Sequence, residues 1–163
     1  MARKIRGELK GDGHSIGIVV SRWNDDITEG LLAGALRALI VTGVAEENIE
    51  IIYVPGAFEL GLALTQLADT RKFSALVALG CVIRGETTHF EHISEAAMRA
   101  MLDVSLKYKI PVGCGVLTTE TIEQAIQRSS ADDENKGSEA AMAAIEMLSV
   151  ASQIHQSFHP EFF

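Results

Sequence analysis

Residues 75–83 read ALVALGCVI, an aliphatic run that stops at a polar Arg84 and a glycine. The run is too short for a typical buried helix, and its residues are apolar at alternate as well as adjacent positions. We therefore predict a strand that is buried on both faces, as strands of parallel sheets usually are. Three further short runs predict strands of the same kind: 15–20 (SIGIVV), 49–54 (IEIIYV) and 110–116 (IPVGCGV).

Segments of helical periodicity alternate with these strands, near 25–42, 58–70, 89–107, 120–129 and 136–155. Parallel strands need crossover connections, and helices are the usual crossovers, so this alternation predicts a parallel sheet covered on both faces. The expected fold class is α/β: a three-layer α/β/α sandwich with a four-stranded parallel sheet and right-handed crossovers.

The length of 163 residues suits one hydrophobic core, and no linker, repeat or low-complexity segment divides the chain. We expect a single domain over 1–163, with an N-terminal arm at 1–14 and a C-terminal tail at 156–163. The formal net charge of −8 argues against a nucleic-acid partner, which needs a basic face. An anionic small substrate remains compatible, because one or two local arginines can make a positive pocket in an acidic protein.

Cysteine usage and the N-terminal sequence favour a cytoplasmic location. The two cysteines, Cys81 and Cys114, do not make a disulfide scaffold. The basic stretch MARKIRGELKGDG has no apolar segment behind it, so it does not resemble a signal peptide. The longest apolar run, 74–83, is far too short to span a bilayer, and we expect no membrane partner.

Candidate chemistry lies at the predicted carboxyl ends of the strands, where ligands bind in open α/β sheets. These ends are 21–24, 55–59, 81–89 and 114–119. His89 is the leading catalytic candidate, because imidazole titrates near neutral pH and this one follows two threonines at a helix start. Hydroxyls and free backbone N–H groups there suit proton transfer on an anionic substrate. A lone histidine is more often a cap or a surface residue, but the loop context favours catalysis.

The string GCVIRGETTHFEHI at 80–93 resembles the active-site loop of the lumazine synthase family. Four more strings resemble that family, in order along nearly the whole chain: SRWND (21–25), VPGAFELG (54–61), GVLTTETIEQAI (115–126) and NKG (135–137). The resemblance implies a flavodoxin-like fold and a transferase of riboflavin biosynthesis. Such enzymes condense 5-amino-6-(D-ribitylamino)uracil with 3,4-dihydroxy-2-butanone 4-phosphate to 6,7-dimethyl-8-ribityllumazine. Phosphate and water are released, and neither a metal nor a cofactor is needed.

The resemblance also implies the site residues. His89 matches the histidine that moves protons during the condensation. The pyrimidine contacts fall on Trp23, Ala57, Phe58, Glu59, Cys81, Val82, Ile83 and, from a neighbouring subunit, Cys114. The phosphate contacts fall on Glu86, Thr87 and a neighbouring subunit's Arg128, with Lys136 as a secondary cation.

Plainer roles stay open for several of these residues. Trp23 could belong to the core, Arg84 could form a structural ion pair in its loop, and Arg128 complements the dipole at a helix end. Both cysteines depart from the family pattern, since Cys114 stands where many members carry Phe or Asn, and Cys81 where a small hydroxyl residue is frequent. No basic group flanks either thiol in sequence, so we expect both to be buried and inert.

Two other functions compete with this interpretation. A metal hydrolase would use His89 and His92 with Glu91 between them, but the zincin motif places its histidines four residues apart, with glutamate directly after the first. A non-catalytic flavin-binding or shell-forming paralogue would keep the fold, and fold alone does not exclude it. The presence of both His89 and Arg128 argues against that paralogue.

The resemblance implies a homo-oligomer: a pentamer, which in some members builds a sixty-subunit icosahedral shell, with riboflavin synthase as a further partner. Members that stop at pentamers often carry extra residues between the last two helices. Here the link from Arg128 to Lys136 is the short SSADDEN, so a shell is sterically allowed. The three carboxylates at 132–134 would repel their copies where rings meet, and salt would screen them. We expect the pentamer and favour the shell.

Overall fold

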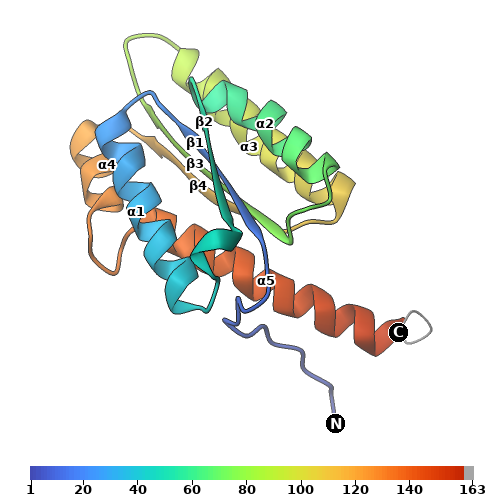
Figure 1. Cartoon of the computed structure of the whole chain (residues 1–163). Helices are drawn as coiled ribbons and strands as arrows, with labels where there is room; N and C mark the ends of the chain where they lie inside the picture. Colours follow the sequence, from blue (N-terminus) through green and yellow to red (C-terminus); the bar gives the residue numbers. More distant parts are fainter. Residues whose placement is uncertain (160–163) are drawn as a thin grey trace.

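Four strands form one sheet in the computed structural model, which describes residues 1–159. They are β1 (Ile16–Ser21), β2 (Ile49–Val54), β3 (Ala75–Ile83) and β4 (Val112–Thr119). Their order across the sheet is β2-β1-β3-β4, and each neighbouring pair is parallel (Figure 1). The predicted four-stranded parallel sheet is confirmed.

Helices cover both faces of the sheet, which confirms the three-layer α/β/α sandwich (Figure 1). One face carries α1 (Asp25–Val41), α4 (Ile122–Ser129) and α5 (Lys136–Phe158). The other face carries α2 (Leu60–Asp69) and α3 (His89–Tyr108). Two short 3-10 helices, η1 (Glu46–Asn48) and η2 (Ala57–Glu59), precede β2 and α2. Because α3 and α4 lie on opposite faces, the two helices that carry the main site candidates are separated by the sheet.

Burial differs between the central and the edge strands. All of β1 is buried, whereas β2 at the edge buries only Val54, and Tyr53 keeps 49% of its surface exposed. The prediction that all four strands are buried on both faces is therefore wrong for β2. An edge strand has a neighbour on one side only, and the apolar composition of IEIIYV does not reveal that position.

The observed span of β4 also differs from the predicted 110–116. Lys109 ends α3 in the left-handed conformation with φ 52°, and Pro111 lacks the N–H that a strand residue donates. At its carboxyl end, β4 continues to Thr119, where its last three residues pair with the last three residues of β3. Cys114 therefore lies inside the strand, which corrects the prediction that 114–119 is a carboxyl end.

The predicted helices are present, and their ends differ from the predicted ones by up to three residues. The predicted helix 58–70 is divided into η2 and α2, and α5 continues past residue 155 to Phe158. The last turns of α5 extend away from the sheet beside the N-terminal arm, where Arg3 donates a 2.6 Å hydrogen bond to Ser157 (Figure 1). Residues 160–163 of the predicted tail lie outside the described residues. Within residues 1–159, no helix has the length and apolarity that a membrane crossing requires.

Asn135 fixes the link between α4 and α5. Its buried side-chain amide donates hydrogen bonds to carbonyl oxygens in α1 and at the end of α4. Its oxygen accepts the Ser138 N–H at the start of α5, at 3.0 Å. A Cβ on Gly137 would collide with the Leu31 carbonyl, so only glycine allows this close approach of α5 to α1. The NKG string therefore has a structural role, which sets where Arg128 and Lys136 lie.

Candidate active site

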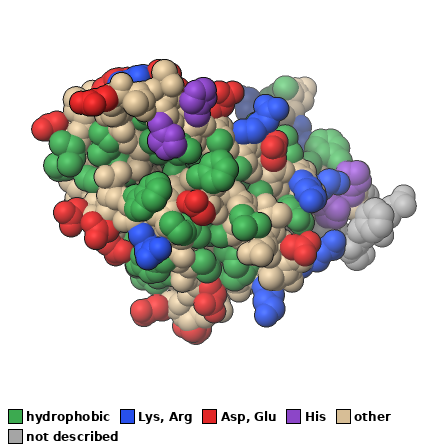
Figure 2. Space-filling view, turned by 90° about the horizontal axis from the view of Figure 1, so that it is seen from above, with side chains coloured by type: hydrophobic (Ala, Val, Ile, Leu, Met, Phe, Trp, Pro, Cys, Tyr) green, Lys and Arg blue, Asp and Glu red, His purple; other side chains and the backbone are tan. Residues whose placement is uncertain are grey.

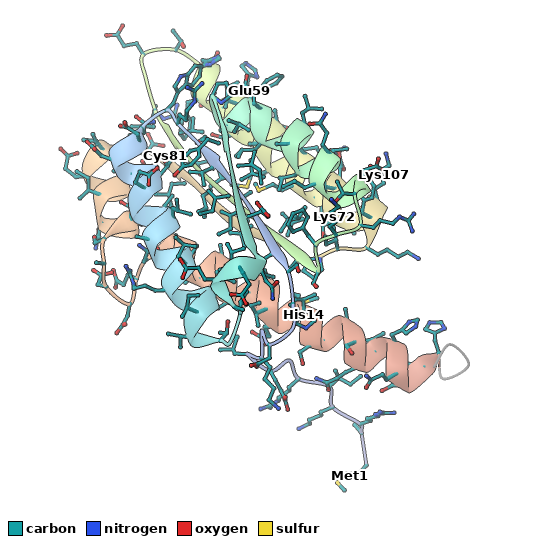
Figure 3. All side chains as sticks on the ribbon, in the orientation of Figure 1. Met1, His14, Glu59, Lys72, Cys81 and Lys107 are labelled. Atoms are coloured by element: carbon teal, nitrogen blue, oxygen red, sulfur yellow. The ribbon has the colours of Figure 1, made fainter. Side chains whose placement is uncertain are left out.

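The carboxyl ends of β1, β2 and β3 bring the first group of predicted site residues together. Trp23 follows β1, η2 follows β2, and Cys81 lies near the end of β3. The Asn24 side-chain amide donates to the Cys81 carbonyl oxygen at 3.0 Å, which ties the end of β1 to that of β3. Glu59 and Cys81 lie toward this end of the sheet, whereas His14 lies near the other end (Figure 3). Seen from above, histidine side chains lie among exposed hydrophobic ones (Figure 2).

Trp23 presents its indole at the surface of this end. Its backbone N–H donates to the Pro55 carbonyl oxygen at 3.1 Å, so the residue continues the pairing of β1 with β2. A Cβ on Gly56 would lie 2.7 Å from Cε3 of the indole, so the ring sits directly against this glycine. Because 66% of Trp23 is exposed, it is not a core residue, and its ring is available for stacking.

The three residues of η2 differ in exposure. Ala57 is buried, whereas Phe58 keeps 64% of its surface exposed close to the end of β2. Glu59 Oε2 accepts the Gly56 N–H at 3.0 Å and so caps the start of η2. This contact holds the carboxylate near the indole of Trp23, since both groups meet at Gly56.

The end of β3 extends beyond its pairing with β1. The last pair between the two strands is Val20 with Leu79, so 80–83 continue without a strand on that side. Val82 and Ile83 are half-buried, and their side chains pack against the cores on the two faces. No strand lies beside this segment on the β1 side, where the Cys81 carbonyl oxygen accepts the Asn24 side-chain amide.

The loop from Arg84 to His89, called here the 84–89 loop, is exposed along its whole length. A Cβ on Gly85 would meet no atom within 4 Å, so the middle of the loop stands away from the rest of the described chain. Thr88 begins α3 without a side-chain cap, and the His89 N–H reaches Thr87 Oγ1 only at 3.4 Å. The positive end of the helix dipole at this start favours an anion.

Arg84 forms the structural ion pair that was one of its predicted alternatives. Its Nε lies 2.6 Å from Glu120 Oε2, and its Nη1 lies 2.9 Å from Glu91 Oε1. Its guanidinium also lies over the Phe90 ring, 4.7 Å from the centroid. Hydrogen bonds to Glu91 and then Glu120 raise the pKa of Arg84 above its ordinary value. The guanidinium is therefore engaged by protein groups.

A second group of predicted site residues lies apart from the first, along β4. A groove of about 230 Å³ is lined by 114–119 together with Arg128 and Lys136. Arg128 Nη1 donates to the Gln124 carbonyl oxygen at 3.0 Å, and Lys136 Nζ lies 2.8 Å from Glu139 Oε2. The lining of this groove does not include His89 or any other residue of the 84–89 loop. Within one chain, the candidate phosphate cations and the candidate proton carrier are thus on different sides of the sheet.

The two cysteines occupy different environments. Cys81 is buried, as predicted, and burial raises the pKa of its thiol to about 11, so very little thiolate forms near neutral pH. Cys114 is exposed, which contradicts the prediction of a buried thiol, because it lies on the edge strand β4. Its Sγ lies 3.5 Å from Met98 Sδ on α3.

The family model for 6,7-dimethyl-8-ribityllumazine synthase matches residues 13–152 of the chain. The chain belongs to this family. A 6,7-dimethyl-8-ribityllumazine synthase of Desulfatibacillum aliphaticivorans is 49% identical over 153 residues, covering 94% of this chain and 99% of the relative. The predictions of a lumazine synthase and of a transferase of riboflavin biosynthesis are confirmed.

Sequence patterns missed two contacts that shape this lumazine synthase site. Asn24 adopts a left-handed conformation, with φ 59°, and holds the Cys81 carbonyl. The sequence did contain a signal for this contact: asparagine tolerates positive φ, and Asn24 stands between a predicted strand and a predicted helix. An ion pair of Arg84 was a predicted alternative, but its partner Glu120 had no such signal, because the two residues belong to different loops. Among residues 1–159, no group of three or more His, Cys, Asp or Glu side chains could hold a metal ion.

Proposed function

We propose that this chain condenses 5-amino-6-(D-ribitylamino)uracil with 3,4-dihydroxy-2-butanone 4-phosphate, using the residues at the carboxyl ends of its strands. The observation that carries the proposal is the gathering of an exposed indole, a held carboxylate and a histidine-bearing loop at one end of the sheet. The indole suits a flat heterocycle, the carboxylate can accept hydrogen bonds from a polar chain, and the loop before the helix start suits an anion. The product is 6,7-dimethyl-8-ribityllumazine, released with phosphate and water.

The pyrimidine stacks on Trp23 in this proposal. The adjoining segment 57–59 and the backbone of 81–83 contact the ring edge and the ribityl chain. Support comes from the exposure of Trp23 and Phe58 and from the absence of a strand beside 80–83. An aromatic ring pair arranged in this way adds to the affinity beyond the area that it buries.

The phosphate binds at the 84–89 loop and the start of α3. Thr87 donates its hydroxyl, and Glu86 contributes its backbone N–H with its carboxylate turned away, since a carboxylate beside phosphate would repel it. The positive end of the α3 dipole adds to the attraction, and Thr88 at the helix start provides no side-chain cap that would compete with an anion.

His89 moves protons between the reacting groups. The primary amine of the pyrimidine attacks the ketone, and loss of water gives an imine. Phosphate then leaves by elimination, and the ribitylamino nitrogen closes the second ring with loss of water. A group that titrates near neutral pH can both accept and donate a proton along this path. Holding two reactive partners together supplies much of the remaining acceleration.

A neighbouring subunit completes the site. Arg128, Lys136 and Cys114 line the β4 groove, whose lining includes no residue of the 84–89 loop, and we propose that they serve the loop of another copy. The family implies an oligomer, and we propose a pentamer built head to tail, since each chain then gives one half-site and receives another. The planar fork of Arg128 suits two phosphate oxygens. Riboflavin synthase, which takes up the lumazine product, remains a predicted partner, and two free cysteines suit a reducing cytoplasm.

Turnover tests the proposed reaction directly. Incubation of the chain with both substrates should release phosphate and give the green fluorescence of the lumazine product. Exhaustive chelation beforehand should leave the rate unchanged, because no step needs a metal. Binding of riboflavin without any turnover would contradict the proposal and support the non-catalytic paralogue.

We also propose that the pentamers build the icosahedral shell. The link between α4 and α5 is short and anchored by Asn135, and its carboxylates at 132–134 are exposed. Light scattering should therefore show shell-sized particles at high salt and a shift toward pentamers at low salt, where repulsion is least screened. The double variant Asp133→Asn, Glu134→Gln should assemble at lower salt than the parent. A mass of about five chains under every condition would rule out the shell.

A further inference from the structure

The 84–89 loop has few contacts that could hold it in place. All its residues are exposed, and its middle, at Gly85, faces open space. The hydrogen bond inside the loop, from the His89 N–H to Thr87 Oγ1, is long at 3.4 Å. A loop that must place a proton carrier and a phosphate site within a fraction of an ångström needs a firmer support.

Arg84 supplies contacts in three directions from the first position of the loop. Its backbone N–H donates to the Thr119 carbonyl oxygen at 2.9 Å, which fixes the loop start on the end of β4. Its guanidinium joins Glu91 in the first turn of α3 to Glu120 beyond β4, at 2.9 Å and 2.6 Å. The same group covers the Phe90 ring, next to His89. Both ends of the loop are thus connected through one side chain.

We infer that Arg84 is a positioning residue, which clamps the 84–89 loop and the start of α3 against the turn between β4 and α4. The inference rests on the proposed role of His89 and the loop in catalysis. The ion pair holds the first turn of α3 at a fixed distance from β4, and His89 lies in that turn. Without these ion pairs, the loop can still form, but the side chains of His89 and Thr87 are no longer held in fixed positions relative to each other.

Arg84 does not act as a phosphate ligand. Two carboxylates already engage its guanidinium, so the cluster of Arg84, Glu91 and Glu120 carries a net negative charge. Such a cluster offers a phosphate little electrostatic attraction. Within the β4 groove, Arg128 is the cation placed for that role, because its Nη1 donates to the Gln124 carbonyl oxygen and not to a carboxylate.

The clamp also connects the two halves that each chain contributes to different sites. Glu120 lies at the start of α4, where its N–H and that of Thr121 both donate to Gln124 Oε1. Thr121 closes the capping box of the same helix, and Arg128 lies in its last turn. The contact between Arg84 and Glu120 therefore fixes the position of the 84–89 loop relative to α4, the helix that presents Arg128 to the neighbouring subunit.

Two variants that break the same contact from opposite sides test the inference. Arg84→Gln and Glu120→Gln should each lower kcat roughly tenfold to a hundredfold, as small misplacements of catalytic groups do. The pyrimidine affinity, read from quenching of Trp23 fluorescence, should change by less than about twofold, because the ion pairs of Arg84 are with Glu91 and Glu120 and involve neither Trp23 nor η2. Arg84→Lys, which can keep one ion pair, should recover part of the lost rate.

The carboxylate variant separates positioning from direct phosphate binding. If Arg84 bound phosphate, Glu120→Gln would leave the guanidinium paired with Glu91 alone and lower KM for the butanone phosphate, and that result would overturn the inference. Equal loss of pyrimidine binding in both variants would indicate general unfolding and would overturn it too. Lys10→Gln, which removes the exposed pair between Lys10 and Glu8, is the matched control and should keep the parent kinetics.

The outcome for Arg84 can be distinguished from failure of the proposed function. If His89→Ala slows the enzyme and Arg84→Gln does not, the clamp is wrong while the role of the loop stands. If neither variant changes kcat, the loop is not the catalytic element, and both proposals fall.

Discussion

Replacing His89 with alanine is expected to lower kcat by roughly 10²–10⁴-fold, the usual contribution of a general acid–base group. His89 is exposed at the first position of α3, so the substitution removes the imidazole without opening a cavity in the core. Binding of the pyrimidine should persist, because Trp23 and η2 are unchanged. The residual rate would report what positioning alone achieves.

Steady-state kinetics with both substrates measures this effect. Trp23 is the only tryptophan in the sequence, so quenching of its fluorescence gives the pyrimidine affinity of the same variant. His92→Ala is the matched control, because His92 lies one turn further along α3, is also exposed and has no proposed role. A parental kcat in His89→Ala would remove His89 from the mechanism.

Local patterns predicted the elements that hold this histidine. The run ALVALGCVI became β3 with the predicted bounds, and the helix after it starts at His89 as expected. Both outcomes follow from short-range chemistry: aliphatic residues with two buried faces require a central strand, and the polar loop after Ile83 ends it.

Positions set by the whole sheet could not be predicted in this way. IEIIYV and SIGIVV look alike in sequence, yet β2 is an exposed edge and β1 is central. The end of β4 depends on its register with β3, which carries it to Thr119. Cys114 was expected in the interior for the same reason, since its apolar neighbours do not show that its strand is an edge.

Contacts between distant segments were also beyond local patterns. The Asn135 amide reaches the Gly30 carbonyl across 105 residues, and Arg84 reaches Glu120 across 36. Each pair is an ordinary polar contact, but only the folded chain brings its two partners together, so sequence patterns do not identify them. The resemblance predicts only a secondary cation, Lys136, in the NKG string, whereas in the structure its asparagine and glycine hold α5 close to α1 and α4.

Arg128→Ala should raise KM for the butanone phosphate by roughly tenfold to a hundredfold, as expected for loss of a hydrogen-bonded charge pair. The KM for the pyrimidine should change far less, since the proposed contact of Arg128 is with the phosphate, whereas the pyrimidine stacks on Trp23. Gln127→Ala, the preceding and exposed position on the same helix, is the matched control. Equal increases in both KM values would contradict a role in phosphate binding.

Mixing the two defective variants tests whether a neighbour supplies Arg128. A site formed by the loop of an Arg128→Ala chain and the β4 groove of a His89→Ala chain has both functional residues. In randomly mixed oligomers roughly a quarter of the sites meet this condition, so activity should rise well above that of either variant alone. If Arg128 instead served the loop of its own chain, every site would lack one residue. The mixture would then show only the average of the two variants, because exchange of subunits could not bring His89 and Arg128 into one site.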